Sequence, residues 1–101
     1  MNTTKPLSKS ALPLFNLGQT VATPGALETL HSLGMTGLEL LKRHHCGDWG
    51  DLDAEDIATN NAALNNGARL FSSYQITNQI KIWIITEADR SVTTLMLPEE
   101  Y

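Results

Sequence analysis

The chain has 101 residues, of which 42% are hydrophobic and 18% charged, and its formal net charge is −4. A chain of this length is close to the commonest domain size and can bury one core without a disulfide. The excess of 11 acidic over 7 basic residues excludes broad phosphate binding, which needs clustered Lys and Arg. On composition, nucleic acid is therefore not an expected partner.

Cysteine usage and hydropathy predict a cytoplasmic protein. Cys46 is the single cysteine, so no disulfide can form within the chain, and a lone thiol suits a reducing compartment. No apolar run reaches the roughly 18 residues of a membrane span, so no membrane association is expected. Pro6 and Pro13 interrupt the start of the chain, which is not typical of a signal peptide. We expect a flexible lead-in over residues 1–13 and one domain over residues 14–101.

Residue patterns predict a first helix that begins after Thr23 and a third that begins after Asp53. Thr23 is an N-cap with Pro24 at the first helical position, where a missing N–H costs nothing. Gly34 ends this first helix. Asp53 precedes the third helix, and the sequence Asn65-Asn66-Gly67 ends it.

The second predicted helix lies between Thr36 and Gly47. Thr36 and Glu39 have the spacing of a capping box, and Met35 and Leu40 have that of a hydrophobic staple. The three- and four-residue rule places three side chains on one apolar face: Leu38, Leu41 and His45. Basic side chains crowd the last turn, where they complement the helix dipole.

The pattern then changes from helical to alternating. Strands are predicted over residues 69–76, 80–87 and 92–97, because these runs are rich in β-branched and aromatic residues and turn residues separate them. A weaker fourth strand is expected over residues 14–21. The chain therefore predicts an α+β fold: three N-terminal helices followed by a three- to four-stranded antiparallel meander, with the helices packed on one face.

The central predicted strand is apolar on both faces. Alternation places Ile82 and Ile84 on one face, and Trp83 and Ile85 on the other. The helices are expected to cover the first face. The second, with Leu95 or Phe71 beside Trp83, needs cover from either the N-terminal segment or another protein. We therefore identify Trp83, Ile85 and Leu95 as a candidate surface for a protein partner or a homodimer.

The most concentrated chemistry lies between His44 and Leu52. The spacing of His44, His45 and Cys46 is poor for metal ligands, because adjacent residues at a helix end point in different directions. A nucleophilic Cys46 is not expected either, since the negative end of the helix dipole disfavours a thiolate. The sequence predicts no metal and no cofactor.

The next four residues predict a structural corner between two helices. Gly47 and Gly50 allow positive φ, Asp48 can form an Asx-turn, and Trp49 can fill the core beneath them. This arrangement explains all four residues without a ligand.

An alternative catalytic site combines the helix end with the second hairpin. His44 or His45 would move a proton, and Arg90 with Thr93 would stabilise the phosphorane of metal-independent RNA cleavage. Other polar side chains nearby are Arg69, Ser72, Ser73, Thr86 and Thr94. Helices followed by a meander resemble the barnase, colicin and RelE-like ribonuclease toxins in architecture alone. A solvated hairpin with threonines suited to strands explains the same residues.

Several strings of residues also resemble one family. They are residues 21–27 (VATPGAL), 47–52 (GDWGDL), 82–94 (IWIITEADRSVTT) and 97–101 (LPEEY). Over roughly residues 14–101 the chain resembles a family of small proteins of bacterial plasmids and integrative elements, often labelled type I restriction methylase subunits. The chain itself is too short for a cofactor-binding methyltransferase and lacks a Gly-rich turn after a strand.

The resemblance implies an accessory protein of a mobile genetic element. Such proteins commonly counter host restriction or CRISPR defence, or serve in toxin–antitoxin pairs. Our main hypothesis is a non-enzymatic protein that acts by binding another protein, including inhibition of a host defence system. The alternative is a small metal-independent ribonuclease toxin of a toxin–antitoxin pair, which would act on RNA.

Overall fold

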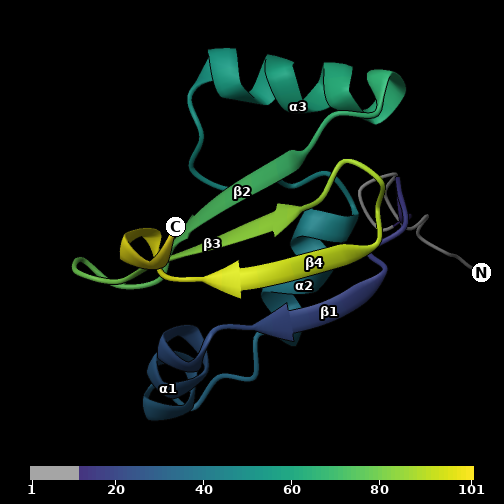
Figure 1. Cartoon of the computed structure of the whole chain (residues 1–101). Helices are drawn as coiled ribbons and strands as arrows, with labels where there is room; N and C mark the ends of the chain where they lie inside the picture. Colours follow the sequence, from purple (N-terminus) through teal and green to yellow (C-terminus); the bar gives the residue numbers. More distant parts are fainter. Residues whose placement is uncertain (1–11) are drawn as a thin grey trace, which may run out of the picture.

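A computed structural model describes residues 12–101, so the expected lead-in over residues 1–13 lies almost entirely outside the described part. The fold is α+β, with three α-helices and four strands among these residues (Figure 1). In chain order the elements are β1 Gln19–Ala22, α1 Pro24–Ser32, α2 Leu38–His45, α3 Ala54–Asn66, β2 Leu70–Gln75, β3 Lys81–Thr86, β4 Val92–Met96 and the 3-10 helix η2 Pro98–Glu100.

The four strands form one mixed sheet in the order β1-β4-β3-β2. The meander β2–β3–β4 is antiparallel, as predicted. The prediction of a purely antiparallel sheet that follows all the helices is wrong, because β1 precedes the helices and pairs parallel to β4. Parallel neighbours need a long crossover connection, and here everything from α1 to β3 forms it. The strand expected over residues 14–21 is limited to β1, since residues 14–18 form no strand. The local residue pattern carries no information on the direction of its pairing.

Helices α1 and α2 cover one face of the sheet and form the main core with it. Thr23 caps α1 as expected, because its Oγ1 accepts a hydrogen bond of 3.1 Å from the Ala26 N–H. The buried members of this core are Ala26, Leu30, Leu40, Tyr74, Ile82, Ile84 and Leu95. The opposite face of the sheet has no α-helix over it within the described residues (Figure 1).

Helix α2 differs from its predicted form at its start and in its buried face. It begins at Leu38 after Gly37, whose φ is 85°, and no side chain caps it. Thr36 instead accepts a hydrogen bond from the Leu38 N–H at 3.3 Å. The buried residues are Leu40 and His44, whereas Leu38 is 68% exposed. The helix is rotated in this way because hydroxyl groups on the sheet satisfy a buried His44, which hydropathy does not anticipate.

Helix α3 lies along the outer edge of β2 (Figure 1). The predicted caps are present: Asp53 accepts a hydrogen bond of 2.8 Å from the Asp56 N–H, and Gly67 has a φ of 77°. The buried side chain of Asn60 accepts from the Phe71 N–H at 3.1 Å and donates to the Phe71 carbonyl at 2.5 Å. One amide therefore replaces a neighbouring strand at this position.

The corner at residues 47–50 closes the rest of the β2 edge. Ser73 donates its N–H to the Trp49 carbonyl at 3.1 Å, and Asp51 donates its N–H to the Ser73 carbonyl at 2.7 Å. Gly47 and Gly50 have φ values of 87° and 80°, and Trp49 is 4% exposed. Asp48 accepts a hydrogen bond from the Gly50 N–H at 3.1 Å. The buried tryptophan, the left-handed glycines and the Asx-turn are as predicted.

We predict that Trp49→Ala lowers the free energy of unfolding by about 3–5 kcal/mol, because it leaves a large cavity between the corner and α3. The matched control, Trp49→Phe, keeps a ring there and loses the hydrogen bond from the indole N–H to Asn61. It should cost about 1–2 kcal/mol. Urea denaturation followed by circular dichroism measures both. Equal costs for the two variants would show that the ring volume is not what stabilises the corner.

Candidate functional site

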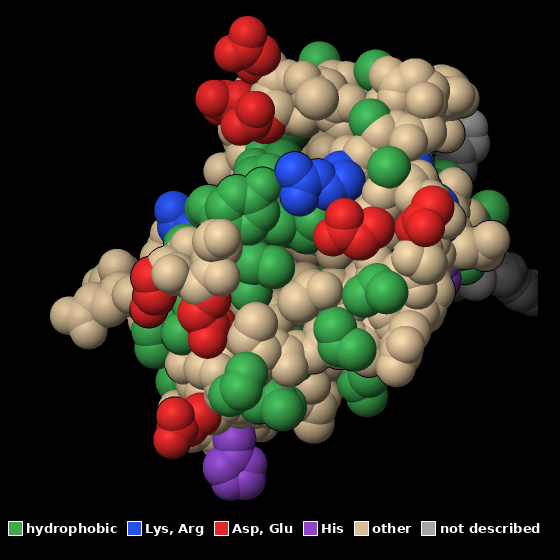
Figure 2. Space-filling view, viewed as in Figure 1, with side chains coloured by type: hydrophobic (Ala, Val, Ile, Leu, Met, Phe, Trp, Pro, Cys, Tyr) green, Lys and Arg blue, Asp and Glu red, His purple; other side chains and the backbone are tan. Residues whose placement is uncertain are grey.

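The sheet face without helices carries a hollow lined by aromatic and aliphatic side chains. Its volume is about 350 Å³, and its lining residues are Arg69, Phe71, Trp83, Ile85 and Tyr101. Hydrophobic side chains gather over β2 and β3 on this face, with basic side chains next to them (Figure 2). We call these five residues the open-face site.

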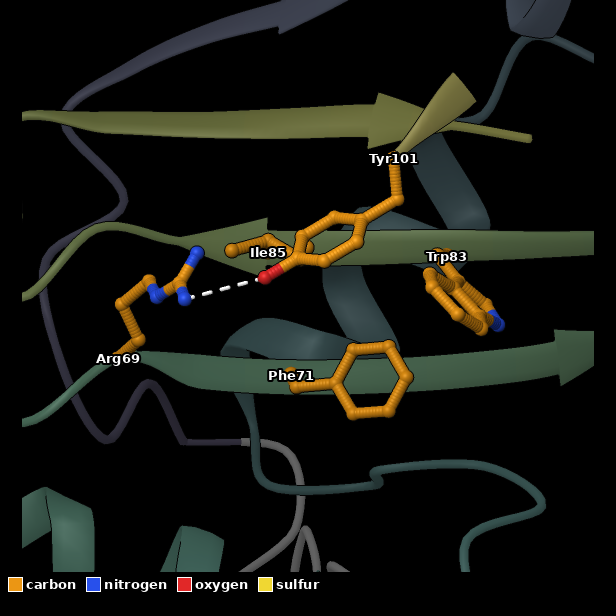
Figure 3. A pocket seen from close by; sticks show the side chains of 5 residues that line it. All are labelled: Arg69, Phe71, Trp83, Ile85 and Tyr101. Carbon is orange, nitrogen blue, oxygen red and sulfur yellow. Dashed lines mark hydrogen bonds between the residues drawn. The ribbon is translucent and has the colours of Figure 1, made fainter. Parts of the chain in front are cut away.

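Strand register explains why the apolar side chains of β2 and β3 meet in the open-face site. Phe71 on β2 pairs with Ile85 on β3, and Trp83 lies two residues before Ile85, on the same face. The rings of Phe71 and Trp83 meet edge to face with centroids 4.9 Å apart. The two rings and Ile85 form a continuous apolar floor (Figure 3).

Tyr101 enters the site from beyond the sheet. Helix η2 turns the chain back after β4, and the Tyr101 ring then lies over Ile85 (Figure 3). Its centroid is 5.8 Å from that of Trp83. Arg69 donates a hydrogen bond to the Tyr101 hydroxyl at 3.1 Å, and its guanidinium carbon lies 5.9 Å from the ring centroid. Tyr101 is nevertheless 68% exposed.

A carboxylate fixes the turn that carries Tyr101. Glu100 accepts hydrogen bonds from the Thr23 hydroxyl at 2.5 Å and from the Leu97 N–H at 2.9 Å. These two donors hold the pKa of Glu100 below its ordinary value. The same threonine caps α1, so the last turn of the described chain is fastened to the start of α1.

The structure corrects one residue of the predicted surface. Leu95 pairs with Ile84, lies on the helix-covered face and is 3% exposed, so it cannot stand beside Trp83. The register of β4 against β3 decides this, and the sequence of β4 alone does not fix it. Ile85 does lie beside Trp83, but it is only 5% exposed and forms the floor of the hollow.

The described residues before β1, residues 12–18, do not cover the open-face site. Leu14 donates its N–H to the His45 carbonyl at 3.0 Å. The Phe15 ring lies 5.3 Å from the ring of His44 and 6.1 Å from that of Trp49, centroid to centroid. Residues 14 and 15 therefore pack against the end of α2, behind the sheet. Of the described chain, it is the Tyr101 turn that reaches over Trp83.

Two of the polar residues in the ribonuclease alternative contact His44, and Thr93 joins them through Thr86. His44 Nδ1 is 2.6 Å from the Ser72 hydroxyl, and His44 Nε2 is 2.9 Å from the Thr86 hydroxyl. The Thr86 hydroxyl is 2.7 Å from that of Thr93, which donates to the Leu17 carbonyl at 2.7 Å. The exposed fractions of His44, Ser72, Thr86 and Thr93 are all 0%.

Each hydroxyl has one proton to donate, and this fixes the donor and the acceptor in every hydrogen bond of the series. The proton of Thr93 goes to Leu17, so Thr93 accepts from Thr86, and Thr86 in turn accepts from Nε2–H of His44. His44 Nδ1 therefore accepts from the Ser72 hydroxyl. Burial, followed by the nearby charges of His45 and Arg90, lowers the pKa of His44 from 6.5 to about 3. A neutral imidazole without solvent access joins α2 to the sheet and cannot reach a substrate in this conformation.

The other residues of the alternative are also engaged within the fold. His45 Nε2 lies 2.8 Å from the Phe15 carbonyl. Arg90, with a φ of 62°, donates to the carbonyls of Ala68 at 2.7 Å and Ala63 at 3.0 Å. These carbonyls lie at and just beyond the end of α3, which has no basic residue in its last turn. The Arg90 guanidinium thus stabilises a helix end.

Three further findings concern the described residues only. Within residues 12–101, no three His, Cys, Asp or Glu side chains gather closely enough to hold a metal ion. Cys46 is buried and free. In the same part of the chain, every helix is too short or too polar to cross a bilayer.

Sequence reasoning missed Arg69 and Tyr101 as members of the open-face site. Arg69 was detectable, because it lies two residues before Phe71 and the predicted hairpin aligns Phe71 with the strand of Trp83. Tyr101 was not detectable, since its position depends on the hydrogen bonds that Glu100 makes with Thr23 and Leu97.

Comparisons with known protein families, curated proteins and solved structures find no match to the chain.

We predict that the protein loses about 2 kcal/mol of stability between pH 7 and pH 5 through His44. The folded pKa of about 3 lies below the unfolded value of 6.5, so the unfolded state binds the proton first and stability falls as the pH falls through this range. Urea denaturation at both pH values measures the loss. His44→Gln should remove it.

The control His31→Gln removes an exposed imidazole of α1 and should keep the pH dependence of the wild type. If His44→Gln leaves the difference between pH 7 and pH 5 unchanged, His44 is not held neutral by the fold.

Proposed function

We propose that the protein acts without catalysis, by binding another protein at the open-face site. One observation carries this proposal: a hollow of about 350 Å³ with an apolar floor lies on a sheet face that no α-helix of the described chain covers. Large exposed apolar patches on a small domain commonly mark interaction sites.

The residue types of the site support binding rather than chemistry. Trp, Tyr and Arg are the side chains most often found at the energetic centres of protein interfaces. Here Trp83, Tyr101 and Arg69 stand together, and the hydrogen bond from Arg69 to Tyr101 orients both side chains before a partner arrives. The hollow has the size to take one or two apolar side chains of a partner.

The resemblance to plasmid and integrative-element proteins supports a biological setting. In that setting the protein is a cytoplasmic accessory protein of a mobile element, and the partner is a host protein such as a component of restriction or CRISPR defence. The ribonuclease alternative has less support, because His44 and Thr93 have no exposed surface.

Partner capture from a host lysate, with tagged protein as bait, tests the proposal. We predict that Trp83→Glu abolishes capture, because an unpaired charge would be desolvated at the centre of the interface. The matched control is Asn78→Glu, which adds the same charge in the exposed turn after β2. The control should keep capture. Circular dichroism should show that both variants are folded.

Two results would contradict the proposal. One is partner capture by Trp83→Glu at the wild-type level. The other is an RNA-cleaving or growth-inhibiting activity that His44→Ala or Arg90→Ala removes while both variants stay folded. This second result would favour the ribonuclease alternative.

A further inference from the structure

The two edges of the sheet differ in whether their outward-facing backbone groups have hydrogen-bond partners. At the β2 edge, outward-facing backbone groups bind Asn60 or the corner at residues 49–51. At the other end of the sheet order lies β1, whose one strand partner among the described residues is β4. The outer side of β1 is therefore an open edge (Figure 1).

The backbone groups at this open edge can be assigned. Gln19 donates its N–H to the Ser91 carbonyl at 2.9 Å, and Thr23 donates its N–H to the Leu95 carbonyl at 3.0 Å. Backbone groups alternate in direction along a strand. The N–H and C=O groups of Thr20 and Ala22 therefore point away from β4, toward the open side.

The short strand β1 lacks the charges and the proline that often block an exposed edge. Natural edge strands often carry charges, especially Lys, or a proline. The sequence of β1 is Gln-Thr-Val-Ala, and residues 14–26 contain no charged side chain. The edge is thus chemically suited to pair with another strand.

An apolar groove accompanies the edge on the helix side. It has a volume of about 270 Å³ and runs between β1, α1 and α2. Its lining includes Leu27, which is 57% exposed, and Leu38, which is 68% exposed. Val21 is 38% exposed on the other face of β1. A strand added at this edge would cover apolar side chains on both faces of the sheet.

We propose that this edge binds a second copy of the chain, with the two β1 strands antiparallel about a twofold axis at Val21. In that register Thr20 of each copy lies opposite Ala22 of the other, so their free N–H and C=O groups satisfy one another. Val21 lies opposite its own symmetry mate, and the two sheets become one.

Two features favour a second copy over another occupant. The edge is self-complementary and uncharged, so two copies do not repel each other there. The β2 edge is closed, so each copy offers one edge, and the assembly ends at two chains instead of growing into a filament. This surface is separate from the open-face site, and the proposal does not depend on the proposed function.

Sedimentation equilibrium of the full chain tests the proposal. We expect a mass of twice 11.1 kDa for the wild type. Val21→Lys should give the mass of one chain, because two like charges would face each other on the axis. Thr20→Pro should do the same, since it removes an N–H that points away from β4. Asn78→Lys adds the same charge in a distant turn and should stay dimeric.

Cross-linking tests the register. In a Cys46→Ala background, Val21→Cys should form a disulfide-linked dimer when diamide is added, because directly opposed residues of this pair type suit disulfide geometry. Gln19→Cys lies far from its symmetry mate in this register and should remain uncrosslinked. Efficient cross-linking through Gln19→Cys instead of Val21→Cys would overturn the register.

If sedimentation equilibrium gives the mass of one chain at every protein concentration, the dimer proposal is wrong. Dimerisation only after removal of residues 1–11 would then assign the edge to that segment, and capture of a foreign extended peptide would assign it to another protein. The two proposals fail separately. Trp83→Glu should keep the dimer, and Val21→Lys should keep partner capture at the open-face site.

Discussion

The buried imidazole of His44 joins α2 to the sheet through hydrogen bonds at both of its ring nitrogens. The two ring nitrogens of His44 in α2 form hydrogen bonds with Ser72 of β2 and Thr86 of β3. The series of hydrogen bonds continues from Thr86 through Thr93 of β4 to the Leu17 carbonyl just before β1. A single series of hydrogen bonds thus ties α2 to β2, β3 and β4 and to the segment just before β1. Because the four side chains of this series are buried, loss of one would leave the next polar group unsatisfied, which is costly in a low-dielectric interior.

This series of hydrogen bonds fixes which side of α2 faces the sheet. It thereby also helps to decide which face of the sheet the helices cover. With Leu40 and His44 facing inward, α2 and α1 occupy one face, and the opposite face keeps Trp83 and Phe71 half-buried. The edges are asymmetric too, because the corner and Asn60 close β2 while β1 stays open. Both candidate interaction surfaces therefore lie where residues 12–101 leave the sheet uncovered.

Local signals in the sequence predicted much of this structure. The caps Thr23 and Asp53, the glycines of the corner, the buried Trp49 and the antiparallel meander all depend on a few neighbouring residues or on strong alternation. The direction of β1 and the register that removes Leu95 from the open face depend on pairing between distant segments. The inward turn of His44 and the bidentate role of Asn60 depend on partners far along the chain, so a hydrophobicity pattern places such polar side chains outside.

The parallel pairing of β1 with β4 has a consequence for the order of folding. The hydrogen bond from Thr93 to Leu17 spans 76 positions, whereas β2, β3 and β4 follow one another through short turns. Contacts between distant segments require closure of a long loop before any stabilisation is gained, and they form late for that reason. We therefore expect the three-stranded hairpin unit to form first and β1 to join it last. In that order β4 would be an exposed edge until β1 pairs with it, so a different strand would be open to incorrect pairing during folding.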